Sequence, residues 1–123
     1  MKYVGLAYEE ERVLNALSNE EWLILRRETL EYVEELRRAG TLLAAEPLKS
    51  VRTAATVRIR GGKTVITDGP FTETKETLGG FFVFEAKSLD EAIKIASRWP
   101  SARIGSIEVR PLEEGLNQER RYT

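Results

Sequence analysis

The apolar residues of this chain follow two periods, one of two residues, typical of strands, and one of about 3.6 residues, typical of helices. The first, together with a short apolar run at 42–48, predicts strands at residues 2–8, 42–48, 55–60, 63–66, 81–86 and 104–110. The second predicts two helices, which begin at Ser18 and Ser88 and end at Gly40 and before Pro100. The order is strand, helix, strand, hairpin, strand, helix, strand. It predicts a ferredoxin-like α+β sandwich, with an antiparallel sheet, two helices on one face and an inserted β-hairpin.

Both predicted helices begin with a serine followed three residues later by a glutamate, the pattern of a capping box. Each has one apolar stripe that we expect to be buried against the sheet. The stripes consist of Trp22, Leu25, Thr29, Tyr32 or Val33, and Leu36 in the first helix, and of Leu89, Ala92, Ile93, Ala96 and Trp99 in the second.

The pair Gly61-Gly62 separates two alternating runs, which predicts a hairpin with a two-residue loop. This loop sets Arg60 opposite Lys63, Ile59 opposite Thr64, Arg58 opposite Val65 and Val57 opposite Ile66. Val57, Ile59 and Ile66 then share one face of the hairpin.

The strand at Phe81–Phe84 is apolar on both faces, so we expect both faces to be covered. The helices cover one face. A second copy of the sheet would cover the other, which predicts a symmetric homodimer.

The 123 residues suffice for one domain, predicted at 1–112, followed by a polar tail at 113–123. The chain has no Cys and no His, which excludes thiolate catalysis, Ser–His catalysis and the usual zinc sites. We predict no metal site and no cofactor. A net charge of −1 gives no electrostatic signal for nucleic acid, and no apolar run is long enough for a membrane span. The start at Met1-Lys2-Tyr3 lacks the features of a signal peptide, so a cytoplasmic location is expected.

The segment Asp68-Gly69-Pro70-Phe71, with Leu78-Gly79-Gly80-Phe81 after it, resembles the signature of the DGPF proteins. These are a branch of the YCII-related family, within the dimeric α+β barrel superfamily. The resemblance covers roughly residues 1–112, including the late run Gly105-Ser106-Ile107-Glu108-Val109-Arg110-Pro111. It implies a dimeric α+β barrel.

The resemblance implies little about a reaction, because most members have none established, and many are encoded near extracytoplasmic-function sigma factors. Some relatives resemble small-molecule enzymes that use a His–Asp pair, which a chain without His does not carry. We therefore expect a non-catalytic small-molecule-binding or accessory module, linked to sigma-factor regulation. The alternative is a cofactor-independent lyase or isomerase that uses Asp68 as acid or base.

Asp68 has two interpretations, a carboxylate in a pocket or a residue that stabilises the Asp-Gly-Pro turn. Glu73 and Lys75, two residues apart on a long loop, could pair across a ligand pocket or be ordinary solvated loop residues. Arg58, Glu108 and Arg110 are expected on the open side of the sheet. There they would bind a ligand or form ion pairs at the dimer interface.

Overall fold

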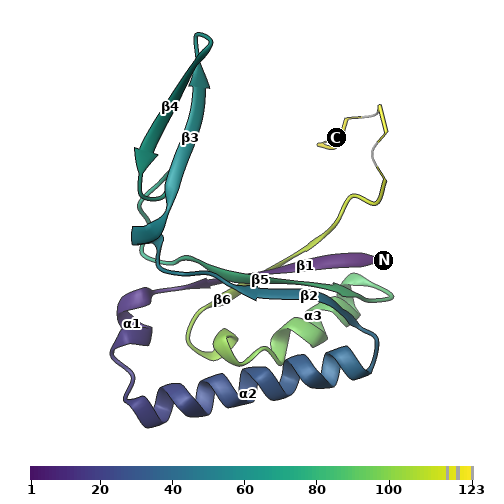
Figure 1. Ribbon diagram of the computed structural model, residues 1–123. Helices are drawn as coiled ribbons and strands as arrows, with labels where there is room; N and C mark the ends of the chain where they lie inside the picture. Colours follow the sequence, from purple (N-terminus) through teal and green to yellow (C-terminus); the bar gives the residue numbers. More distant parts are fainter. Residues whose placement is uncertain (116, 119, 123) are drawn as a thin grey trace.

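A computed structural model describes residues 1–115, 117, 118 and 120–122 of the chain. Its main sheet is antiparallel, with the strand order β2-β5-β1-β6. The strands are β1 (Lys2–Glu9), β2 (Leu42–Pro47), β5 (Thr77–Glu85) and β6 (Ser106–Pro111). Helices α2 (Asn19–Arg38) and α3 (Leu89–Ser97) cover one face, and the hairpin of β3 (Ala55–Arg60) and β4 (Lys63–Asp68) projects from the other side (Figure 1). The predicted ferredoxin-like α+β fold with an inserted hairpin is confirmed.

Local signals in the sequence determine the ends of the helices. Ser18 and Glu21 form the full capping box of α2, and Gly40 follows its last turn with a φ of 73°. At α3 only half of the predicted box forms, in which the Ser88 side chain accepts a hydrogen bond from the Glu91 backbone. A short helix that the periodicity did not predict, α1 (Glu11–Asn15), connects β1 to α2. A 3-10 helix, η2 (Pro100–Arg103), follows α3, and none of the described helices is long and apolar enough to cross a membrane.

The core lies between the sheet and the two helices. Phe82 and Phe84 are fully buried there, and the ring of Phe82 stacks on Trp99 with 3.9 Å between the ring centroids. The Tyr32 hydroxyl donates a hydrogen bond of 2.6 Å to the Ile95 carbonyl, which joins α2 to α3. Since such buried aromatic contacts contribute strongly to stability, they fix the helices on this face.

Three of the residues predicted in the buried stripes are exposed. Trp22 is 41% exposed, and Leu89 and Ile93 are each 49% exposed. The first turn of α2 lies beside a cavity rather than on packed core, so Trp22 stays partly exposed. The buried side of α3 carries Ala92 and Ala96, so Leu89 and Ile93 lie at the margin of this side.

The opposite face of the sheet is largely apolar and has no helix over it. Strand alternation directs to it the side chains of Val4, Leu6, Tyr8, Phe81 and Val83, all of them half-buried in the single chain. Ser106, Glu108 and Arg110 of β6 form a polar edge beside them. We call this surface the open face.

The hairpin belongs to a self-contained insertion, residues 49–76, which we call the arm. It begins and ends at one point, because the Leu48 backbone donates a 2.8 Å hydrogen bond to the Gly79 carbonyl. It also contains the 3-10 helix η1 (Val51–Thr53). The predicted hairpin register is confirmed at all four pairs, and Gly61 and Gly62 have positive φ values of 55° and 75°. Val57, Ile59 and Ile66 are each more than 60% exposed, so one side of the arm is apolar and uncovered.

Candidate functional site

A cavity of about 320 Å³ lies between α2 and the sheet. Its floor comes from β1 and β5, its wall from α2, and its edge from β2 and the start of η2. Most of its lining is apolar, from the residues Ala7, Leu14, Trp22, Leu25, Leu30, Val33, Ala45, Phe81, Phe82 and Trp99. Both the size and the composition fit a small, largely apolar ligand.

Two tryptophans form part of the cavity wall. Trp99 is held by its stack on Phe82. Trp22, on the first turn of α2, is partly exposed. Both tryptophans of the chain therefore line the same cavity.

Glu9, the last residue of β1, places a carboxyl group in this cavity. It is in phase with the buried residues Tyr3 and Ala7, so its side chain is directed to the helix-covered face. It also lines a neighbouring cleft of about 440 Å³ beside α1 and the base of the arm. Its carboxyl lies against the Cα of Gly79, where a side chain would collide with it.

The environment of Glu9 favours its protonated form. Burial raises the pKa of Glu9 above its ordinary value of 4.5, and the nearby negative charge of Glu11 raises this pKa further. A partly buried carboxyl with a raised pKa, at the wall of an apolar cavity, has the properties of a general acid or base.

The environment of Glu11, in contrast, favours its ionised form. Its two carboxylate oxygens accept hydrogen bonds from the Ser50 hydroxyl at 2.6 Å and from the Val51 backbone at 2.9 Å. These bonds lower the pKa of Glu11. Glu11 thus fixes the start of the arm to α1 and keeps a negative charge close to Glu9.

The sequence did not single out Glu9. It stands first in the run Glu9-Glu10-Glu11, which reads as a solvated acidic stretch. The position of Glu9 in the alternation of buried and open residues along β1 was a usable signal. It continues the alternation of Tyr3 and Ala7, so a charged residue falls on the buried side of a strand.

Asp68 lies outside the cavities. It is the exposed last residue of β4, at the base of the arm, and it lines neither the cavity nor the neighbouring cleft. The neighbouring turn is held by backbone bonds, in which Gly69 donates to the Ala54 carbonyl at 2.7 Å and Thr56 donates to the Gly69 carbonyl at 2.9 Å. Within the described chain, the Asp68 side chain forms no hydrogen bond or ion pair, so the structure gives it no visible turn role.

Glu73 and Lys75 lie on the exposed loop between β4 and β5. They form no ion pair with each other or with another described residue, and they line neither the cavity nor the neighbouring cleft. The loop is connected to β6 through a different residue, since the Ser106 hydroxyl donates to the Glu76 carboxylate at 3.1 Å. The ligand role predicted for Glu73 and Lys75 stays a prediction.

Glu108 and Arg110 lie together at the polar edge of the open face, joined by an ion pair of 2.9 Å. Arg58 is half-buried on β3 of the arm, opposite Val65, and has no contact with this pair in the single chain. The three residues are not brought together within one copy. Their proposed binding or interface role therefore depends on a second copy or a ligand.

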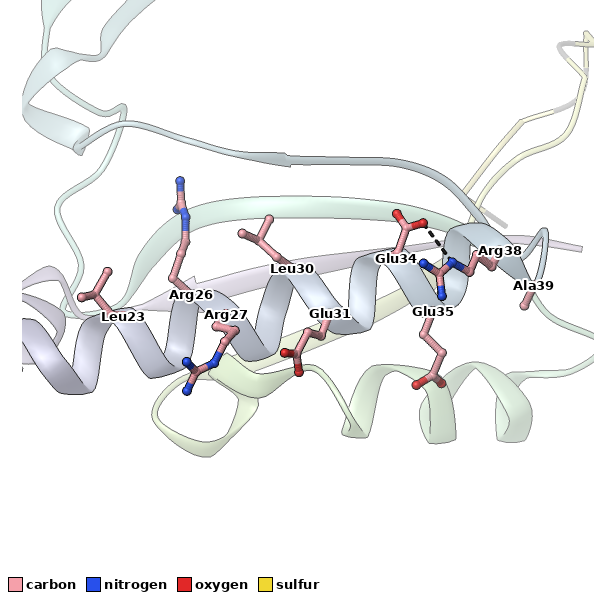
Figure 2. A pocket seen from close by; sticks show the side chains of 9 residues that line it. All are labelled: Leu23, Arg26, Arg27, Leu30, Glu31, Glu34, Glu35, Arg38 and Ala39. Carbon is pink, nitrogen blue, oxygen red and sulfur yellow. Dashed lines mark hydrogen bonds and ion pairs between the residues drawn. The ribbon is translucent and has the colours of Figure 1, made fainter.

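A further strip of polar and apolar side chains runs along α2 (Figure 2), and its Arg26 and Leu30 also line the cavity. Because all of its residues come from one helix, it is an open surface and not an enclosed site. Its Glu34 pairs with Arg38 at 3.1 Å, an ordinary i, i+4 pair on a solvated face. In the described part of the chain, no group of three or more acidic side chains is placed to hold a metal ion.

Comparisons with known proteins agree with this architecture. An uncharacterised protein of Rhizobium meliloti (strain 1021) is 40% identical over 114 residues, which cover 91% of this chain and 92% of that protein. Among solved structures, the chain resembles the 5-chloro-2-hydroxyhydroquinone dehydrochlorinase of Burkholderia phenoliruptrix AC1100 in complex with 2,5-dihydroxybenzoquinone. The TM-score is 0.56 at 18% identity, over 94% of this chain and 96% of that one, which shows a shared fold.

The profile of the YCII-related domain matches residues 1–115, nearly the whole described chain. The match includes the DGPF segment, the helix-covered sheet and the arm. This chain therefore belongs to the YCII-related domain family.

Proposed function

We propose that this protein binds a small aromatic molecule in the cavity between α2 and the sheet. The observation that carries the proposal is the cavity itself, about 320 Å³ with aromatic walls and one partly buried carboxyl. A dehydrochlorinase of the same fold that was crystallised with a dihydroxybenzoquinone supports a ligand of this size and class.

Binding is measured by titration with 2,5-dihydroxybenzoquinone and hydroquinone, with 1,4-cyclohexanediol as a non-aromatic control. Calorimetry gives the affinity, and intrinsic fluorescence reports the place, because both tryptophans line the cavity. We expect the two planar probes, the quinone and the aromatic hydroquinone, to bind, and Leu25→Trp, which fills the cavity, to weaken binding at least tenfold. Leu23→Trp is the matched control, since Leu23 is 63% exposed on the same helix and does not line the cavity. Equal affinities in both variants would contradict the proposal.

A second candidate function is a cofactor-independent lyase or isomerase with Glu9 as its acid–base group. It is favoured by one observation, the raised pKa of Glu9 in the cavity wall, whereas Asp68 lies exposed and away from it. The test is chloride release from a chlorinated hydroxyhydroquinone, measured with a chloride electrode. Turnover lost in Glu9→Gln and kept in Asp68→Asn would support Glu9, the reverse would support Asp68, and binding without turnover would support the non-catalytic module.

We also infer that two copies associate through their open faces. The support is the row of half-buried apolar side chains on this face and the exposed apolar side of the arm, which projects from the same side (Figure 1). The cytoplasmic location, the link to sigma-factor regulation and the boundary of the domain at residue 112 remain predictions.

A further inference from the structure

The charged side chains at the mouth of the cavity differ in how far they are neutralised. The mouth lies between α2 and the edge strand β2 and is lined by Arg26, Arg37 and Glu46. Arg37 approaches the Glu34 carboxylate at 3.8 Å. Glu46 stands opposite Phe81 in the sheet register, so strand alternation directs its side chain to the open face, away from α2. Arg26 has no carboxylate partner among the described residues.

Arg26 is also the cation most closely associated with the aromatic wall. Its guanidinium carbon lies 5.7 Å from the centroid of the Trp22 ring, a cation–π distance. In Figure 2 it rises from α2 toward the sheet, while Arg27 points to the other side of the helix. A guanidinium without a partner at such a place offers planar donors that match a carboxylate or another oxyanion.

The floor of the cavity carries an acidic side chain, in contrast to the cation at its mouth. Glu9 comes from β1 rather than α2, and its environment favours the protonated form, so at this end a neutral hydroxyl group is a better partner than an anion. The two polar ends of the cavity therefore differ, with a cation at the mouth and a partly buried carboxyl of raised pKa at the floor.

We propose that the ligand is an aromatic acid, with its ionised group on Arg26 at the mouth, its ring against the aromatic wall and a hydroxyl toward Glu9. This inference rests on the proposed binding function and assigns Arg26 as the residue that determines specificity for an anionic ligand.

The test uses two probes of the same shape, 3-hydroxybenzoate and 3-hydroxybenzamide, at pH 7.5. We expect the wild-type chain to bind the acid at least tenfold more tightly than the amide. Arg26→Gln should reduce this preference below threefold, chiefly by weakening the binding of the acid. The matched control is Arg27→Gln, which removes the same charge from the next residue of the same helix and should keep the preference.

The outcomes separate this inference from the proposed function. Equal binding of acid and amide by the wild type would overturn the anion site and leave the aromatic cavity standing. A preference that survives in Arg26→Gln, or is lost equally in Arg27→Gln, would also overturn the assignment, because general surface charge would then explain it. If neither probe, nor the quinone and hydroquinone, binds, both proposals fail. A preference retained in part by Arg26→Lys would support a charge contact over a packing role.

Discussion

The ring of Phe82 lies directly over the Cα of Gly5, its partner on the neighbouring strand β1. A methyl group at Gly5 would overlap the ring, so only glycine fits at this position. Because Phe82 in turn stacks on Trp99, this one close approach positions two walls of the ligand cavity.

Gly5→Ala should therefore affect both stability and binding. Phe82 is fully buried and held between Gly5 and Trp99, so overpacking should cost about 1–3 kcal/mol of the free energy of unfolding. A displaced ring should also weaken binding of hydroquinone. Denaturant unfolding and calorimetry measure the two effects. Gly40→Ala is an instructive comparison, because its added methyl meets no atom and its cost comes from its φ of 73° alone. It should leave binding unchanged.

Core truncations should be costly in proportion to burial. Phe84 is fully buried and Leu36 is 6% exposed, so Phe84→Ala and Leu36→Ala should each lose roughly 2–5 kcal/mol of unfolding free energy through lost transfer energy and a cavity. Leu23→Ala, on an exposed position of α2, should change it by less than about 0.5 kcal/mol. Unchanged denaturant midpoints for both core variants would show that the assignment of faces is wrong.

Glu9 and Glu11 should respond to pH with opposite signs. Because the folded chain raises the pKa of Glu9, the contribution of Glu9 to stability is fully present below its unfolded pKa, near 4.5. It is lost as the pH rises through the higher folded value. The lowered pKa of Glu11 gives a contribution present above about 4.5, which is lost as the pH falls through the lower folded value.

Thermal melts from pH 3 to 8 measure the two contributions. At pH 7, Glu9→Gln should leave the unfolding free energy unchanged or raise it, because an ionised, partly desolvated group is removed. Glu11→Gln should lower it by about 1 kcal/mol, since the bonds from Ser50 and Val51 lose their charge assistance in a partly exposed setting. A loss in Glu9→Gln as large as that in Glu11→Gln would contradict this assignment.

The turn after β4 should depend on Gly69 more than on Asp68. Asp68 is exposed and its side chain has no described partner, so Asp68→Asn and Asp68→Ala should both lie within about 0.5 kcal/mol of the wild type. Gly69 has a φ of 95°, so Gly69→Ala should cost about 1 kcal/mol or more through backbone strain. Chemical denaturation of the three variants checks the order. A loss of 0.5–2 kcal/mol in Asp68→Ala alone would restore the turn role expected from the sequence.

The open face should control assembly. Light scattering at micromolar concentration should give about twice 14.0 kDa for the wild type. Phe81→Asp should give a monomer, because it would bury an unpaired charge between the copies. The control is Leu23→Asp, which adds the same charge to the outer surface of α2 and should leave the dimer intact. A well-folded wild-type monomer would refute association through this face.

Sequence reasoning succeeded where the determinants are local. The α2 capping box, the Gly61-Gly62 turn and the hairpin register each depend on residues close together in the chain, and the structure has all of them. Burial at the ends of elements depends on where other elements stop, so Trp22 and Ile93 came out exposed. The same limit applies to the site. The alternation of β1 puts Glu9 on the helix-covered side, but the cavity beside it is lined by elements far apart in the chain, and no local pattern records that.

Because the base of the arm is closed, substitutions or length changes in the arm can be separated from changes in the cavity walls. Because residues 48 and 79 are already hydrogen-bonded neighbours, a short turn could join β2 to β5 in place of the arm without altering the order of the sheet. The arm can then vary in length and surface at little cost to the core. The walls of the cavity, in contrast, are part of the core, so a change in them also changes the core. Engineers could exploit this by exchanging the arm to alter what the chain assembles with, while the ligand site keeps its walls.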